Sequence, residues 1–153
     1  MEMLVLAGGF GTRLKSAVND IPKSMAPING TPLLNLQIDH WIQQGQRSFV
    51  FLLHHKADLI IDFLIAKSEK IGELISVNWI VEETPLGTGG SVSHAIKKNN
   101  LTGDILIANS DTWLDGGLAQ MSRCEEAAIA VIRVKDTSRY GSIAMDKNSF
   151  LTK

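Results

Sequence analysis

The stretch MLVLAGGFGTRL, residues 3–14, joins four apolar residues to a segment with three glycines, a threonine and an arginine. The run Met3–Leu6 predicts a short buried strand that ends at a pair of glycines. Glycines let a backbone approach a phosphate closely and turn its N–H groups inward. Thr12 adds a hydroxyl donor, and Arg13 adds a planar guanidinium that suits phosphate oxygens. The stretch therefore predicts a phosphate-binding loop directly after the first strand.

Two common glycine loops do not fit this stretch. A dinucleotide-binding fingerprint that starts at Gly9 needs a third glycine where the chain has Leu14. A Walker A loop needs Lys and then Ser or Thr after its last glycine, but Gly11 is followed by Thr12 and Arg13. The chain thus predicts a phosphate loop of another kind, and an NAD-binding domain is disfavoured.

Further along the chain, apolar runs alternate with helical patterns. Strands are expected over residues 49–53, 77–81, 105–108, 128–134 and 141–145, and helices over 33–44, 58–67 and 91–98. Continuous apolar strands suit a sheet that is covered on both faces. The alternation predicts an α/β fold with a mostly parallel sheet, whose ligands gather at the carboxyl ends of the strands.

The composition sets limits on size, charge and location. The 153 residues, 44% of them hydrophobic, predict one domain over residues 1–153. The 15 Lys and Arg against 16 Asp and Glu give a net charge of -1, so we expect no nucleic-acid partner. No apolar stretch is long enough to span a membrane, so no membrane partner is expected. The single cysteine, Cys124, is expected to be buried, and a cytoplasmic location follows from these features.

A second segment, Asp20 to Ile28, holds one lysine between two prolines. Proline fixes its own φ and restrains the residue before it, so Lys23 is expected on a rigid, extended arm. A lysine held near the α-phosphorus of a nucleotide would stabilise charge during displacement. Taken alone, such a lysine is more often a solvated loop residue.

A third segment, residues 82–91, follows a predicted strand and opens a predicted helix. Its glycines allow a flat base or ribose to lie against bare backbone. Glu82 and Glu83 precede them, and carboxylates accept the N–H donors on the pairing edge of guanine. The segment weakly favours guanine, although either glutamate could simply be solvated.

A fourth segment, residues 109–112, follows the strand expected over 105–108. Asp111 would project from the carboxyl end of that strand, where Mg²⁺ could bind to it and to phosphates. By itself Asp111 could equally be a turn or helix-cap residue. The charged stretch 67–73 is expected to be a solvated helix end, and His54 and His55 lack the neighbours of a metal site.

Together, the four segments resemble the sugar-1-phosphate nucleotidyltransferase family, most of all the short D-glycero-D-manno-heptose 1-phosphate guanylyltransferases, which are similar to mannose-1-phosphate guanylyltransferases. The resemblance implies a Rossmann-like three-layer α/β/α fold and Mg²⁺ as cofactor. It implies catalytic roles for Arg13 and Lys23 and a metal role for Asp111. It implies sugar contacts at Asn109 and Gly141. The nucleotide-binding residues that it implies are Leu6, Ala7, Gly8, Gly9, Gly11, Thr12, Glu82, Pro85, Gly87 and Thr88.

The resemblance also implies the reaction. An NTP, with GTP favoured, and a heptose or hexose 1-phosphate would give an NDP-sugar and pyrophosphate, as precursors of surface polysaccharide. Ser24 departs from the family, which often has proline there, and the family's sugar-binding portion is expected beyond Lys153. A non-catalytic domain that binds a nucleotide or sugar nucleotide is the alternative, and a homo-oligomer is left open.

Overall fold

The computed structural model describes residues 1–9, 21–138, 141–148 and 150–152. Gly11, Thr12 and Arg13 therefore lie outside the described residues. The elements in chain order are β1 (Glu2–Leu6), the 3₁₀ turn η2 (Lys23–Met25), β2 (Pro27–Ile28), β3 (Thr31–Pro32), α1 (Leu33–Gln43), β4 (Ser48–Leu53), α2 (Ala57–Ile71), β5 (Ser76–Val81), α3 (Gly87–Lys98), β6 (Ile105–Asn109) and α4 (Leu118–Met121).

The main sheet has four strands in the order β5-β4-β1-β6, and every neighbouring pair is parallel. The chain runs outward from β1 through β4 to β5 and then returns to the other side of β1 as β6. This reversal creates a switch point between β1 and β6, where a crevice opens at the carboxyl ends of the strands. The predicted parallel α/β sheet is confirmed.

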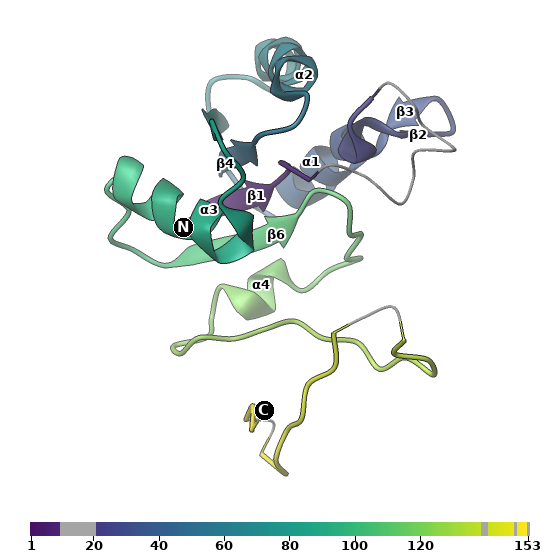
Figure 1. The fold of residues 1–153 in the computed structure, drawn as a ribbon, viewed down its shortest axis with the longest axis vertical. Coiled ribbons are helices and arrows are strands. Elements are labelled where there is room, and N and C mark those ends of the chain that lie inside the picture. The colour runs from purple at the N-terminus through teal and green to yellow at the C-terminus, as the bar shows by residue number, and fades with distance from the viewer. Residues whose placement is uncertain (10–20, 139–140, 149, 153) are drawn as a thin grey trace.

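Helices cover both faces of this sheet (Figure 1). On one face, α1 and α2 bury Ile38 and Ile60 against Val5. On the other face, Ala95 of α3 packs in a second cluster with Leu4. Leu4 and Val5 are adjacent and both fully buried because successive strand residues point to opposite faces. The fold is the expected three-layer α/β/α sandwich.

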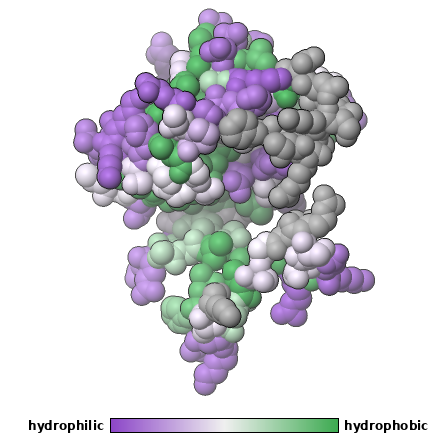
Figure 2. Space-filling view, in the orientation of Figure 1, coloured by the Kyte–Doolittle hydropathy of each residue, from purple (hydrophilic) through white to green (hydrophobic). Residues whose placement is uncertain are grey.

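Two of the expected strands are absent from the described part of the chain. Residues 128–134 are extended without strand pairing, and within 141–145 only Met145 makes a bridge, to Leu151. Their apolar pattern is local, but a strand also needs a hydrogen-bonding neighbour. In Figure 1 this C-terminal stretch runs apart from the sheet, and Figure 2 shows apolar surface in the same part of the molecule. Ile132, on this stretch, is 75% exposed.

Two smaller expectations also fail in this region and in α2. Cys124 is exposed, because it lies on a short turn after α4 and outside both core clusters. Lys67 is buried and bonds to Asn35 and Asp39 of α1, so the charged stretch is solvated only beyond it. No helix among residues 1–9, 21–138, 141–148 and 150–152 is long and apolar enough to cross a membrane.

The segment around Lys23 is more folded than expected. Pro22 has the φ of −57° that suits the start of a helical turn, and Met25 N–H donates to its carbonyl oxygen at 2.8 Å. Lys23 therefore lies on one turn of 3₁₀ helix and not on an extended arm. A two-stranded hairpin, β2 and β3, follows with Asn29 and Gly30 at its turn, both with positive φ.

Candidate active site

The carboxyl edge of the sheet is tied together beyond the ends of its strands. Ala7 N–H donates to the carbonyl oxygen of Leu52 at 2.9 Å, and Ser110 N–H donates to that of Leu6 at 3.0 Å. Glu82 N–H continues the pattern on β4 at 2.8 Å. The loops that leave β1, β5 and β6 therefore start from fixed positions relative to one another.

A cavity of about 500 Å³ opens at this edge. It is lined by residues that follow four different strands and by the turn η2. Its lining consists of Leu6, Ala7, Gly8, Gly9, Lys23, Ser24, Leu52, His54, Glu82, Pro85, Gly87, Thr88, Ser91, Asn109, Ser110 and Asp111. A cavity of this size is typical of small-molecule and cofactor sites.

Most of the candidate site residues from the sequence meet in this one cavity. Those that line it are Leu6, Ala7, Gly8, Gly9, Lys23, Glu82, Pro85, Gly87, Thr88, Asn109 and Asp111. Gly141 does not line it and is exposed on the C-terminal stretch. The structure thus brings residues from separate segments, between Leu6 and Asp111, together in one cavity.

Lys23 and Asp111 form an ion pair although 88 residues separate them. Lys23 Nζ lies 2.6 Å from Asp111 Oδ2, and the two side chains are 41% and 36% exposed. Thr112 Oγ1 donates to the other carboxylate oxygen at 3.3 Å. A cation and an anion are therefore presented together to the cavity, in contact with solvent.

Gly8 brings the end of β1 against the end of β4. A Cβ at this position would lie 3.1 Å from His54 Cβ and 3.2 Å from His54 N. The closeness is to backbone as well as side chain, so a larger residue has little room. Packing against His54 therefore favours glycine at this position, in addition to any contact with a ligand.

The loop between β5 and α3 is organised by Glu82. This side chain is 9% exposed, and its Oε2 accepts the N–H of Leu86 at 3.1 Å. The helix then starts at Gly87, earlier than the expected Ser91, and Gly87 has a φ of +69° that favours glycine. Glu83 is exposed and does not line the cavity, so only one of the two glutamates faces it.

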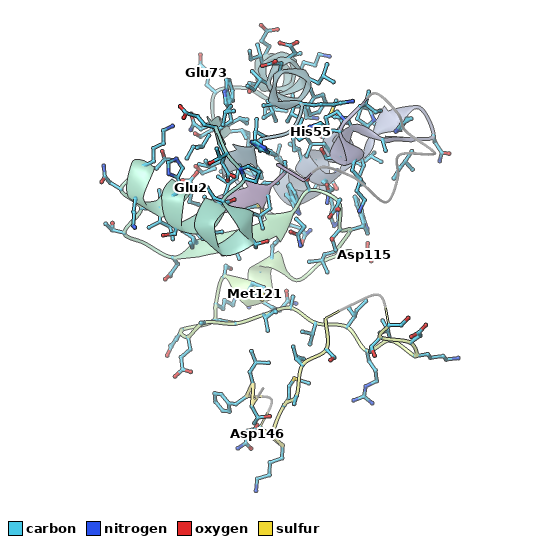
Figure 3. The ribbon with its side chains drawn as sticks, in the orientation of Figure 1. Glu2, His55, Glu73, Asp115, Met121 and Asp146 are labelled. Carbon is cyan, nitrogen blue, oxygen red and sulfur yellow. The ribbon has the colours of Figure 1, made fainter. Side chains whose placement is uncertain are left out.

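The cavity also contains residues that sequence reasoning did not assign to it: Ser24, Leu52, His54, Ser91 and Ser110. His54 follows β4 directly, and its Nδ1 lies 2.8 Å from the carbonyl oxygen of Glu82. Figure 3 labels the next residue, His55, at this edge of the sheet. The position of His54 directly after a strand is the sequence signal for its place in the cavity, because ligands gather at the carboxyl ends of parallel strands.

Asp111 is a suitable ligand for a divalent cation that also binds phosphate. Its carboxylate is partly exposed in the cavity, and Mg²⁺ commonly uses one or two protein carboxylates with phosphate and water. Among the described residues, no group of three or more His, Cys, Asp or Glu side chains could hold a metal ion. A single protein carboxylate is compatible with a cation that also binds phosphate and water.

Comparison with known proteins identifies the family of the chain. Residues 2–153 match the nucleotidyl transferase family. The chain belongs to this family. It is 33% identical over 154 residues to a D-glycero-alpha-D-manno-heptose 1-phosphate guanylyltransferase of Campylobacter jejuni, covering 99% of the chain and 66% of that protein. It is 30% identical to a mannose-1-phosphate guanyltransferase of Pichia angusta, covering 97% and 42%.

A solved structure gives the same fold. The crystal structure of HddC from Yersinia pseudotuberculosis complexed with GMP-PN superposes with a TM-score of 0.80 at 35% sequence identity. The match covers 98% of this chain and 66% of that chain. The chain thus spans about two thirds of the length of its heptose relative and of HddC, and less of the mannose relative.

Proposed function

We propose that residues 1–153 form one nucleotide-binding unit of a sugar-1-phosphate nucleotidyltransferase. The reaction joins an NTP, with GTP favoured, to a heptose or hexose 1-phosphate and releases pyrophosphate. The supporting observation is that residues from four separate segments meet in one cavity at the switch point of the sheet. The names of the related guanylyltransferases agree with this choice of substrates.

The proposed chemistry is a single displacement at the α-phosphorus of the NTP. A phosphate oxygen of the sugar phosphate forms a new P–O bond, while the bond from the α-phosphorus to the bridging oxygen breaks and pyrophosphate leaves. Lys23 would stabilise the charge that develops on the α-phosphoryl oxygens, and Arg13 would hold the leaving pyrophosphate. Positioning and electrostatics supply most of the acceleration in such transfers.

The other site residues take roles in the same proposal. Asp111 would hold Mg²⁺, which when bound neutralises phosphate charge. Asn109 and Gly141 would contact the sugar. The nucleotide would lie on Leu6, Ala7, Gly8, Gly9, Gly11, Thr12, Glu82, Pro85, Gly87 and Thr88. A cytoplasmic location and a role in supplying lipopolysaccharide or capsule precursors complete the proposal.

The test is pyrophosphate release from each of the four common NTPs with a panel of hexose and heptose 1-phosphates in the presence of Mg²⁺. We expect release with GTP and one sugar phosphate. In Lys23→Ala, kcat/KM should fall by about 100- to 1000-fold, because one preorganised charge at the reacting phosphoryl group is lost. Lys70→Ala, an exposed lysine on α2, is the control and should retain full activity.

The alternative class predicts a different result from the same assay. Saturable GTP binding without pyrophosphate release from any pair would indicate either a non-catalytic nucleotide-binding domain or a nucleotide-binding unit without the sugar-binding portion of its longer relatives. The same assay on a longer chain would separate these two. Activity that survives Lys23→Ala unchanged would remove Lys23 from the proposed mechanism. Size-exclusion chromatography with light scattering on the same protein would determine whether it forms a homo-oligomer.

A further inference from the structure

One face of α1 holds the loop that follows β6 through a series of polar contacts. Gln37 Nε2 donates to the carbonyl oxygens of Asn109 at 3.3 Å and Thr112 at 2.8 Å. One turn further, His40 Nε2 lies 3.0 Å from the carbonyl oxygen of Leu114. Residues three apart on a helix share a face, so both side chains reach the same loop.

The contacts of this face continue to α4. The ring of Trp113 stacks on His40 with centroids 4.7 Å apart. Gln44, the C-cap of α1, accepts the N–H of Leu118 at 3.4 Å. In Figure 3, Asp115 lies on this loop and Met121 on the short helix that follows it. The loop is thus attached to α1 at several points, and Gln37 makes the contacts nearest to the cavity.

Gln37 is more deeply buried than His40 and Gln44, the other two side chains that contact this loop. It is 1% exposed, and its Oε1 has no hydrogen-bond partner among the described residues. Both neighbours of Nε2 are carbonyl oxygens, which only accept, so the NH₂ group must face them. A buried acceptor without a partner lowers the free energy of unfolding. An apolar residue in place of Gln37 would not have this cost.

We propose that Gln37 is the positioning residue for Asp111. Its NH₂ group binds the carbonyl oxygens two residues before and one residue after Asp111, on either side of the carboxylate. Fixing both ends of this short turn fixes the direction in which the carboxylate enters the cavity. The role in cation binding rests on the proposed function, whereas the role in ordering the turn does not.

A second buried glutamine provides a matched control. Gln46 is 7% exposed, and its Nε2 also donates to two carbonyl oxygens, those of Met1 at 3.2 Å and Ser48 at 2.7 Å. These lie at the amino ends of the strands, at the opposite edge from Asp111. Gln37→Met and Gln46→Met therefore remove the same kind of contact with nearly the same change of volume.

The first measurement is amide hydrogen exchange of the full chain without ligand. We expect Gln37→Met to raise exchange in residues 109–114 by about tenfold or more, with β1 and β4 unchanged. Gln46→Met should leave residues 109–114 as in the wild type. Should Gln37→Met not fold, Gln37→Leu removes the same donors with a smaller side chain and takes its place.

The second measurement is the Mg²⁺ dependence of pyrophosphate release. Partners that orient a metal ligand typically change metal affinity or activity by about 10- to 100-fold, so Gln37→Met should raise the half-saturating Mg²⁺ concentration by that factor. The KM for the sugar phosphate should be unchanged. Gln46→Met should alter neither, even where it lowers the free energy of unfolding equally.

The outcomes separate this inference from the proposed function. Equal effects of the two substitutions on residues 109–114 and on the Mg²⁺ dependence would reduce Gln37 to a structural residue and overturn the inference. If the wild type neither releases pyrophosphate from any substrate pair nor binds GTP, the proposed function fails. Hydrogen exchange then still decides whether Gln37 orders the turn around Asp111.

Discussion

Single residues at the carboxyl edge of the sheet differ sharply in how much change they tolerate, and the two adjacent glycines show this. A Cβ on Gly8 would press on the backbone and Cβ of His54, whereas no described atom lies within 4 Å of a Cβ on Gly9. We expect Gly8→Ala to lower the free energy of unfolding by about 1–3 kcal/mol through overpacking. Gly9→Ala should change it by less than about 0.5 kcal/mol.

Urea denaturation of both variants checks this prediction. Equal free energies of unfolding for the two variants would show that β1 and β4 separate easily at this point. The comparison also divides the two roles of the loop, since Gly9→Ala can impair nucleotide binding without affecting the fold.

Glu82 is the residue through which guanine preference can be tested. It lines the cavity and is mostly buried, while the adjacent Glu83 is exposed and outside it. A hydrogen bond to a charged group contributes about 1.5–3 kcal/mol, so Glu82→Gln should reduce the preference for GTP over ATP by about tenfold or more. Glu83→Gln is the control, and kcat/KM for each nucleotide is the measurement.

A preference for GTP that persists in Glu82→Gln would mean that the backbone around Gly87 reads the base. Loss of preference in Glu83→Gln alone would contradict the placement of the two carboxylates in the cavity.

At this scale, the sequence predicted which residues share the cavity wherever a distinctive local pattern was present. Gly8, Gly9 and Asp111 follow strands, and Lys23 stands between two prolines. Gln37 was not predicted, because a glutamine among apolar helix residues has no signature of its own. Its contacts with Asn109 and Thr112 arise only when α1 packs beside β6, 72 residues or more along the chain.

At the scale of elements, α1 and α2 are joined by an ion pair whose two partners are unequally buried. The side chain of Lys67 is 10% exposed and that of Asp39 is 43% exposed. Asp39→Ala leaves a buried ammonium with Asn35 Oδ1, at 3.1 Å, as its one remaining acceptor among the described residues. We expect this variant to lose about 1–3 kcal/mol in free energy of unfolding.

Lys67→Met should lower the free energy of unfolding by less, within about 1 kcal/mol, because the half-exposed Asp39 carboxylate stays hydrated. Thermal or urea unfolding of the two variants gives the comparison. A greater loss in Lys67→Met than in Asp39→Ala would show that the apolar stem of Lys67, not its charge, links the helices.

Element prediction succeeded where pattern and tertiary partners agreed. The strands β1, β4, β5 and β6 lie within one or two residues of the expected ranges, because each apolar run finds a parallel neighbour. Residues 128–134 have an equally apolar pattern but no such neighbour in the described chain, so the pattern alone misled. The hairpin of β2 and β3 was missed although its Asn29-Gly30 turn is a strong local signal.

At the scale of the whole molecule, we expect the sandwich to resist proteolysis and the stretch after α4 to be cleaved readily. Backbone N–H groups of residues 127–135 have no hydrogen bond within the described chain, and most of their side chains are exposed. We expect trypsin to cut first after Arg133 or Lys135. Lys67, held in α2 and buried, should be cut far more slowly.

Mass spectrometry of a limited digest identifies the first cuts. Resistance at Arg133 and Lys135 equal to that at Lys67 would show that the stretch is covered in solution. The parallel topology was predictable from the alternation of strands and helices, since adjacent parallel strands need a crossover connection between them. The course of the chain after α4 was not, because it depends on what the apolar residues meet.

The contact between Lys23 and Asp111 has a consequence for selectivity. With nothing bound, each charge is already neutralised by the other, so an incoming ion must exchange partners instead of filling an empty place. A lone anion would deprive Asp111 of its countercharge, and a lone cation would do the same to Lys23. A phosphate that arrives together with a metal ion would supply both. Because an exposed pair of this kind is worth only about 0–1 kcal/mol, we expect joint binding to be favoured over binding of either ion alone by no more than about fivefold.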